Sequence, residues 1–319
     1  MTKPKILVSR RWPEAVETAM VKKYDVTFNI KDKPLSTNEF KDALSIYDAI
    51  LPTVTDKISS EVFRVKNPKT KIFGNYGVGF SHIDIPAAKA AGITVSNTPD
   101  VLSDCTADIT LTLMLMAARR AGEGEREVRS GNWEGWRPRH LIGTRITGKT
   151  LGIIGFGRIG RETAKIALGL GMDVLAYDFS PIPETLPVVF SGGIEVNLPV
   201  KGVTFETLLA ESDFISLHVP FTDKPIIGAA EFAQMKNGAA LVNCSRGGTV
   251  DETALLAALD SGKLAFAGLD VFDNEPTPRQ DLLSHPKISL SPHIGASTNE
   301  AQERIGTELA QLIIDHFKH

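Results

Sequence analysis

One stretch near the middle of the chain limits the possible folds more than any other: residues 150–178, TLGIIGFGRIGRETAKIALGLGMDVLAYD. An apolar run leads into Gly155-x-Gly157-x-x-Gly160, and apolar residues at helical spacing then lead to a second apolar run that ends in Asp178. A glycine motif alone is a weak signal, but here strand, turn, helix and strand follow in the order of a dinucleotide-binding unit. The segment therefore predicts a βαβ unit with a bound dinucleotide, the alternative being a βαβ unit with nothing bound.

The residue types in this motif have physical reasons. Gly155 permits a tight turn, Gly157 lets the backbone approach a pyrophosphate, and Gly160 lets the helix lie close to the sheet. The helix N-terminus offers free N–H groups and a positive dipole end to the phosphates. Asp178 is placed to accept both adenosine ribose hydroxyls, and no Arg or Lys in residues 179–181 is present to neutralise a 2′-phosphate. The motif predicts NAD(H), with NADP(H) less favoured.

Composition excludes several classes of protein. The chain has 319 residues, 42% of them hydrophobic, which is enough for two soluble domains. A net charge of −3 gives no basic surface for nucleic acid or an anionic membrane, and the N-terminus has no signal-peptide pattern. Cys105 and Cys244 form neither a CxxC nor a His-Cys cluster. We therefore expect a cytoplasmic protein with no metal, nucleic-acid or membrane partner.

Strands and helices alternate along the whole chain. Before the glycine motif, short apolar runs predict strands at residues 5–9, 25–28, 49–51, 71–74 and 93–96. After it, strands are expected at residues 214–218, 239–243, 265–269 and 288–290. The final helix, at about residues 298–317, has no sheet of its own and is expected to return to the first lobe. Two doubly wound parallel sheets are the predicted architecture.

Two segments are candidates for a subunit interface. Residues 105–120 are apolar on nearly all sides at helical spacing, so we expect this helix to pack between the lobes and against a second subunit. Residues 126–143 form an expected polar loop with two tryptophans, Trp133 and Trp136. These aromatics indicate an interface or a pocket rim, and a satellite hydrophobic cluster is the alternative. The prediction is a homodimer through residues 99–145.

Three polar side chains follow strands of the second sheet: Arg246, Glu275 and His293. Reduction of a 2-oxo acid needs a proton donor for the developing alkoxide and a fixed positive charge for the carboxylate. Arg246 can fork onto a carboxylate and the adjacent carbonyl oxygen. His293 is the natural acid, and a neighbouring Glu275 carboxylate would favour its protonated form and fix its orientation. Singly, each could instead be a surface arginine, a loop acid or a capped histidine.

Four motifs in order resemble the D-isomer-specific 2-hydroxyacid dehydrogenases: residues 155–160 (GFGRIG), 243–248 (NCSRGG), 268–276 (GLDVFDNEP) and 292–295 (PHIG). The likeness covers the whole chain and is closest to the glyoxylate and hydroxypyruvate reductase branch. It implies a flavodoxin-like substrate lobe of residues 1–98 and 292–319 and a Rossmann NAD lobe of residues 99–291. The active site would lie in the cleft between the lobes, and closure would exclude water.

The resemblance also implies roles for individual residues. Arg246 matches the substrate arginine, His293 the proton donor, and Glu275 the acid paired with it. Val78 and Gly79 match the residues whose backbone N–H groups bind the substrate carboxylate; the alternative for their glycine-rich loop is an ordinary βα turn. Asp270 matches the residue that holds the nicotinamide carboxamide. Beyond Gly155, Gly157, Gly160 and Asp178, the implied cofactor contacts are Thr106, Arg158, Ile159, His218, Pro220, Cys244, His293 and Gly295.

By this likeness the chain reduces glyoxylate or hydroxypyruvate to glycolate or D-glycerate with NADH. Formate dehydrogenases have a glutamine where Glu275 stands, which argues against that activity. A dehydrogenase of D-lactate or a phosphonate, and an NAD(H)-sensing interaction protein on the same fold, remain alternatives. The sequence departs from the family in a long segment at residues 179–203, in a short loop at 221–225, and at His140, where mammalian members of the branch have tryptophan.

Overall fold

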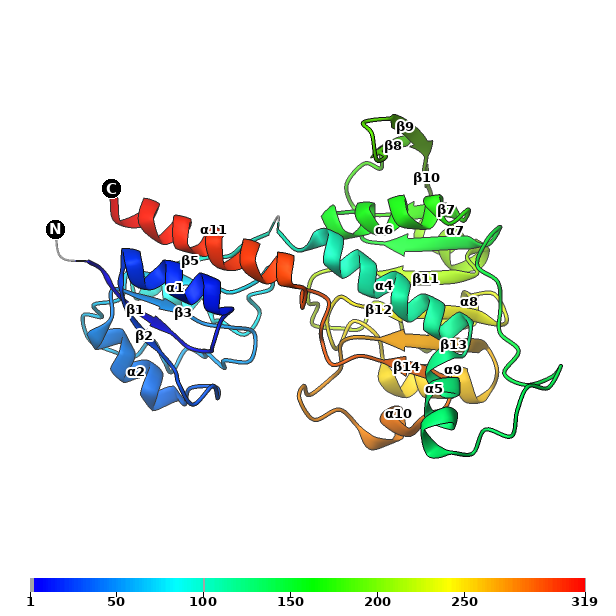
Figure 1. The fold of residues 1–319 in the computed structure, drawn as a ribbon, viewed down its shortest axis with the longest axis horizontal. Helices are drawn as coiled ribbons and strands as arrows, with labels where there is room; N and C mark the ends of the chain where they lie inside the picture. Colours follow the sequence, from blue (N-terminus) through cyan, green and yellow to red (C-terminus); the bar gives the residue numbers. More distant parts are fainter. Residues whose placement is uncertain (1–2, 100, 319) are drawn as a thin grey trace. The chain divides into compact units, whose positions relative to one another are not determined.

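The computed structural model describes residues 3–99 and 101–318, which form two compact units (Figure 1). The first unit contains residues 1–102 and 296–319, and the second contains residues 103–295. The chain therefore leaves the first unit once, completes the second, and returns with its last segment.

The first unit is built on a five-stranded sheet in which all neighbouring strands are parallel. Its strand order β2-β1-β3-β4-β5 is the flavodoxin-like order. The strands are β1 (Lys5–Val8), β2 (Asp25–Phe28), β3 (Ala49–Leu51), β4 (Ile72–Gly74) and β5 (Thr94–Ser96). This sheet confirms the predicted class of the first lobe.

Helices cover both faces of that sheet. The helices are α1 (Glu14–Lys23), α2 (Thr37–Ile46), α3 (Ile85–Ala90) and α11 (Asn299–Lys318). The predicted capping box opens α2: Ser36 Oγ accepts the Glu39 N–H at 3.3 Å, and the Glu39 carboxylate accepts the Ser36 N–H at 2.7 Å. Side chains of α2 and α3 share one core cluster, whereas α11 lies against α1 and against Gly74 of β4.

The second unit contains a seven-stranded parallel sheet with the order β10-β7-β6-β11-β12-β13-β14. Numbered from β6, this is the Rossmann order 3-2-1-4-5-6 with one further strand at the edge. The strands are β6 (Thr150–Ile154), β7 (Asp173–Tyr177), β10 (Lys201–Gly202), β11 (Phe214–Leu217), β12 (Ala239–Asn243), β13 (Leu264–Leu269) and β14 (Ile288–Leu290). The second doubly wound sheet is thereby confirmed.

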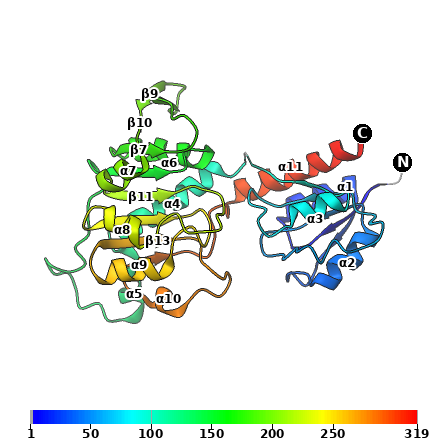
Figure 2. The ribbon, with the colours of Figure 1, turned by 180° about the vertical axis from the view of Figure 1, so that it is seen from behind.

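The sheet of the second unit lies between two layers of helices. In Figure 1, α4 (Ser103–Ala118) and α6 (Arg158–Gly169) cover the near face. Figure 2 shows α7 (Phe205–Glu211), α8 (Ala229–Gln234) and α9 (Glu252–Asp260) on the opposite face, with the short α10 (Gln280–Ser284) nearby. Most residues of α4 are buried by its own unit, against α6 and strands β12 to β14. The apolar side of α4 is therefore covered mainly by its own unit, and packing of this helix against a second subunit stays a prediction.

Two segments differ from what the sequence predicted. The start of the expected loop at residues 126–143 is helical, because α5 (Ala121–Ser130) carries the ion pairs Arg120–Glu123 and Arg129–Glu125 and ends at Gly131, whose φ is 74°. The unusual segment at residues 179–203 forms an antiparallel hairpin, β8 (Thr185–Val189) and β9 (Glu195–Pro199). Its turn uses Gly192 and Gly193 at positive φ, and Leu186 anchors it in the core.

Among the described residues, no helix is long and apolar enough to cross a membrane.

Candidate active site

The glycine loop between β6 and α6 is shaped as the motif requires. Gly155 has φ 91°, and a Cβ there would lie 2.4 Å from the carbonyl oxygen of His218. A Cβ at Gly160 would lie 2.2 Å from the carbonyl oxygen of Gly155, whereas a Cβ at Gly157 would meet nothing within 4 Å. The first and third glycines are thus needed for packing, and the second leaves one side of the loop open at the N-terminus of α6.

Asp178 follows β7 and is fixed beside this loop. Its Oδ2 accepts the N–H of Phe156 at 2.7 Å, and its Oδ1 accepts the N–H of Ser180 at 2.9 Å. Each carboxylate oxygen can accept a further hydrogen bond. The next side chain, Phe179, is 98% exposed. The carboxylate is therefore held in place by the backbone and can still accept hydroxyl groups.

His218, at the end of β11, adds a neutral polar group to the same edge of the sheet. Its Nε2 lies 2.8 Å from Ser216 Oγ, and in the described part of the chain its buried Nδ1 has no hydrogen-bond partner. Burial lowers the pKa of His218 to about 3, so the imidazole is uncharged near neutral pH. Arg158 and Ile159 form the first turn of α6, and the exposed Pro220 follows His218 by two residues.

Glu275 and His293 form a carboxylate–imidazole pair in the second unit that is suited to acid–base chemistry. His293 Nδ1 lies 2.7 Å from Glu275 Oε2, and both side chains are 31% exposed. Burial raises the pKa of Glu275, but the hydrogen bond and charge of His293, the Phe272 N–H and the Arg246 charge together lower it below the ordinary value. A carboxylate that accepts the Nδ1 proton leaves Nε2 as the nitrogen that can exchange a proton. The predicted pairing is thus present in the geometry.

The turn that carries His293 is clamped by Asp270. His293 has φ 54°, a left-handed conformation that a non-glycine residue rarely adopts. Asp270 is almost fully buried; its Oδ1 accepts Ser291 Oγ–H at 2.6 Å and Ile294 N–H at 2.8 Å, and its Oδ2 accepts Gly295 N–H at 2.9 Å. Both oxygens therefore hold the chain on either side of His293. A Cβ at Gly295 would also approach Thr106 Cγ2 at 3.3 Å, which places Thr106 beside this clamp.

Arg246 lies in the loop after β12, which touches the loop that carries Glu275. The Arg246 guanidinium donates to the Ser245 carbonyl at 2.5 Å; burial lowers its pKa, and the Glu275 charge opposes that shift. The Asn243 side-chain amide donates to the carbonyl of Arg246 at 3.2 Å and so fixes the loop. A Cβ at Gly247 would lie 2.0 Å from the Phe272 carbonyl oxygen. Arg246, Glu275 and His293 are thus brought together in one unit.

Cys244 directly follows β12 and is not a reactive thiol. It is 6% exposed, and burial raises its pKa to about 12. A thiol that is protonated at neutral pH is a poor nucleophile. Cys244 packs in a core cluster with residues of α4 and β6, and its contact with the cofactor stays a prediction.

The loop with Val78 and Gly79 belongs to the first unit and is held by two asparagines. Asn75 Nδ2 donates to the carbonyls of Gly77 and Gly79, both at 3.0 Å, and Asn97 Nδ2 donates to the Val78 carbonyl at 2.7 Å. In a trans peptide the N–H points away from the preceding carbonyl. The two side chains thus turn the N–H groups of Val78 and Gly79 to the opposite side. Sequence reasoning missed both asparagines, although each directly follows a strand.

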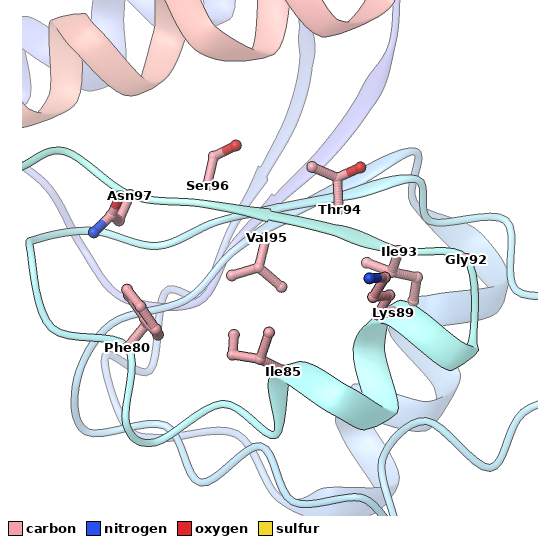
Figure 3. Close-up of a pocket in the computed structure, with 9 residues that line it drawn as sticks. All are labelled: Phe80, Ile85, Lys89, Gly92, Ile93, Thr94, Val95, Ser96 and Asn97. Carbon is pink, nitrogen blue, oxygen red and sulfur yellow. The ribbon is translucent and has the colours of Figure 1, made fainter. Parts of the chain in front are cut away.

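A hollow of about 460 Å³ in the first unit contains none of the predicted site residues (Figure 3). Val95 of the edge strand β5 points toward Ile85 and Phe80, and Ser96 and Thr94 point away from them. Lys89 is the charged side chain among its nine described lining residues. This hollow lacks the convergent polar groups of a catalytic site, so we do not assign the chemistry to it.

The chain is similar in sequence and fold to proteins of one family. Residues 111–295 match the family model of the D-isomer specific 2-hydroxyacid dehydrogenase NAD binding domain. A glyoxylate reductase of Thermococcus litoralis is 42% identical over 322 residues, with 99% of this chain and 94% of the relative covered. A hydroxypyruvate reductase of Thermotoga maritima is 40% identical, with 89% of each chain covered. The crystal structure of a glyoxylate reductase from Paecilomyes thermophila has a TM-score of 0.81 at 31% identity and covers 98% of this chain and 94% of that one. The chain therefore belongs to the D-isomer specific 2-hydroxyacid dehydrogenase family, and it is an NAD-binding oxidoreductase.

Proposed function

We propose that this protein reduces small 2-oxo acids with NADH, with glyoxylate and hydroxypyruvate as preferred substrates and glycolate and D-glycerate as products. The observation that carries the proposal is the 2.7 Å contact between His293 and Glu275, with Arg246 close enough to sense the Glu275 charge. A proton donor, its orienting acid and a planar cation are the groups that reduction of a 2-oxo acid requires. The names of the relatives point to the same substrates.

The residues of the second unit fit a dinucleotide. The packed glycines at 155 and 160, the open side at Gly157 and the N-terminus of α6, where Gly157 is the N-cap, suit a pyrophosphate. Asp178 suits the adenosine ribose hydroxyls, and the buried Nδ1 of His218 is a polar atom that lacks a hydrogen-bond partner among the described residues. NADH, when bound there, supplies the hydride for the carbonyl carbon.

Residues of the chain then bind the substrate's negative charge and transfer the proton. The Arg246 guanidinium binds the substrate carboxylate and the carbonyl oxygen in one plane. His293 donates the Nε2 proton to that oxygen as hydride reaches the carbon, so a 2-hydroxy acid forms and a neutral imidazole remains. Glu275 holds the ring through Nδ1 and stabilises its cationic form until a proton from solvent restores it. We predict that the N–H groups of Val78 and Gly79 donate additional hydrogen bonds to the substrate carboxylate.

The experiment that tests this proposal is a comparison of substrates. We would measure kcat/KM from NADH oxidation with glyoxylate, hydroxypyruvate, pyruvate and a bulkier 2-oxo acid. The proposal requires the highest values for glyoxylate and hydroxypyruvate. A preference for pyruvate would favour a D-lactate dehydrogenase instead, and NADH binding without turnover of any of these acids would favour a sensing protein.

Cofactor choice is proposed to depend on Asp178. Asp178→Ala should weaken NADH binding and reduce the preference for NADH over NADPH by roughly 10-fold, because a carboxylate near the 2′-phosphate disfavours NADPH. Dissociation constants of both cofactors, from the change in their fluorescence, measure this ratio. Asp173→Ala is the matched control, since Asp173 is an exposed acid at the opposite end of the same strand. An unchanged NADH to NADPH ratio in Asp178→Ala would remove Asp178 from the ribose site.

The proposed assembly is a homodimer through residues 99–145. The segment exposes Trp136 by 82%, Trp133 by 55% and Ile142 by 62%, which is an unusual amount of apolar surface for a solvated loop. Trp136→Glu should shift the protein toward monomer in analytical ultracentrifugation. A wild-type chain that stays monomeric at all concentrations would overturn the assignment.

The proposed location is the cytoplasm. Both Cys105 and Cys244 are buried cysteines that form no disulfide, which suits a reducing compartment.

A further inference from the structure

Glu252 is a buried carboxylic acid that has no part in the chemistry proposed above. It is the first residue of α9, follows the helix cap Asp251, and is 7% exposed. Buried glutamates are rare unless a partner satisfies them, because removing the carboxyl group from water is costly. The contacts of Glu252 therefore need an explanation.

The partner of Glu252 lies in the loop that carries Glu275. Glu252 Oε1 accepts the N–H of Asp273 at 2.8 Å, and Glu275 Oε1 accepts the N–H of Phe272 at 2.9 Å. Two successive backbone N–H groups are thus bound by two different carboxyl groups. One of these carboxyl groups is the acid that orients His293, and the other is fixed on α9.

The same short loop is constrained on two further sides. The Phe272 carbonyl oxygen lies so close to Gly247 that a Cβ there would be 2.0 Å away. Asn274, between Asp273 and Glu275, has φ 57°, a left-handed conformation that costs free energy in a non-glycine residue and persists only when its surroundings hold it. Without the bond to Glu252, the Asp273 N–H would lose its acceptor, and the backbone leading to Glu275 could relax.

The charged groups around Glu252 have opposing effects on the pKa of its carboxyl group. Burial raises its pKa and the Asp273 and Asp281 charges add to this, whereas the Asp273 N–H and Arg279 oppose it. Either protonation state keeps an oxygen that can accept a hydrogen bond. An acceptor at this position, rather than a full charge, is what the loop requires.

We infer that Glu252 is a positioning residue that keeps Glu275 against His293 by binding the backbone N–H of Asp273. The inference rests on the proposed function, since it assumes that His293 is the proton donor and Glu275 its partner. Glu252 itself touches neither substrate nor cofactor in this account; it acts through residues 272–275.

The test compares Glu252→Ala, Glu252→Gln and the matched control Asp251→Ala in the full-length protein. Asp251 accepts the N–H groups of Thr253 and Ala254, so Asp251→Ala weakens the same helix start but leaves the Asp273 contact intact. Each variant is characterised by its melting temperature, its NADH dissociation constant and the pH profile of kcat/KM with glyoxylate.

Glu252→Ala should lower kcat by about 10-fold and move the alkaline limb of the pH profile to lower pH by about half a unit or more, because a displaced carboxylate stabilises the imidazolium less well. Glu252→Gln should restore the wild-type profile, because its amide oxygen can accept the Asp273 N–H. Asp251→Ala should lower the melting temperature without moving the limb.

A wild-type pH profile in Glu252→Ala, or an equal shift in Asp251→Ala, would overturn the inference. The wild-type protein and His293→Ala, assayed in parallel, separate this failure from failure of the proposed function. If the wild-type protein turns over neither glyoxylate nor hydroxypyruvate, the proposed function is wrong. If His293→Ala loses turnover and Glu252→Ala keeps the wild-type profile, only the role of Glu252 is wrong.

Discussion

His293→Ala lowers kcat for glyoxylate by roughly 10²-fold or more, because the developing alkoxide loses its proton donor. The structure shows which nitrogen of His293 can donate the proton. Nδ1 lies 2.7 Å from Glu275 Oε2, so Nε2 is the nitrogen left for proton transfer. Rapid-mixing measurement of NADH oxidation in a single turnover separates this step from product release. The effect should appear in the chemical step itself.

A matched control for this variant is His285→Ala. His285 also lies near a carboxylate, with Nε2 3.3 Å from Asp260 Oδ1, in the same unit. We expect its removal to leave kcat near the wild-type value. Near-normal turnover in His293→Ala would show that another group or water supplies the proton.

Arg246→Lys lowers kcat/KM for 2-oxo acids by roughly 10²-fold, because loss of one charge-assisted hydrogen bond costs about 1.5–3 kcal/mol and an ammonium group cannot reproduce the planar fork. Half-buried Arg246 is also fixed by its contact with the Ser245 carbonyl, so lysine has no equivalent anchor. Steady-state kinetics should show a raised KM together with a lowered kcat, since the guanidinium contacts both the carboxylate and the reacting carbonyl.

Arg120→Lys serves as the control for this change. Arg120 also makes a two-point contact to a carboxylate, with Nε and Nη2 2.9 and 2.8 Å from the Glu123 oxygens. It lies at the start of α5 and has no proposed catalytic role. If Arg120→Lys and Arg246→Lys change kcat/KM equally, the effect on Arg246 does not come from the substrate carboxylate.

The parts of the site that could be predicted from the sequence depend on local chemistry. The roles of Gly155, Gly157 and Gly160 could be predicted because their spacing is typical of a turn between a strand and a helix. The proximity of Glu275 and His293 could be predicted because each follows a strand of one parallel sheet, and the carboxyl ends of parallel strands lie at the same edge. The resulting contact between their side chains is present in the structure.

The parts that could not be predicted depend on contacts between distant segments. The Asp270 carboxylate bonds to residues 291, 294 and 295, and Glu252 bonds to the N–H of Asp273; no periodicity encodes either contact. Helix α4 is an example of the same limit. Its apolar pattern correctly indicated burial, but the pattern does not say which surface buries it, and the structure shows its own sheet doing so.

The most direct test of the central claim is the configuration of the product formed from hydroxypyruvate. The purified protein would be incubated with hydroxypyruvate and NADH, and glycerate would be resolved by chiral chromatography while NADH oxidation is followed in the same sample. We expect D-glycerate, formed mole for mole with the NADH consumed. L-glycerate, or NADH oxidation without glycerate, would contradict it.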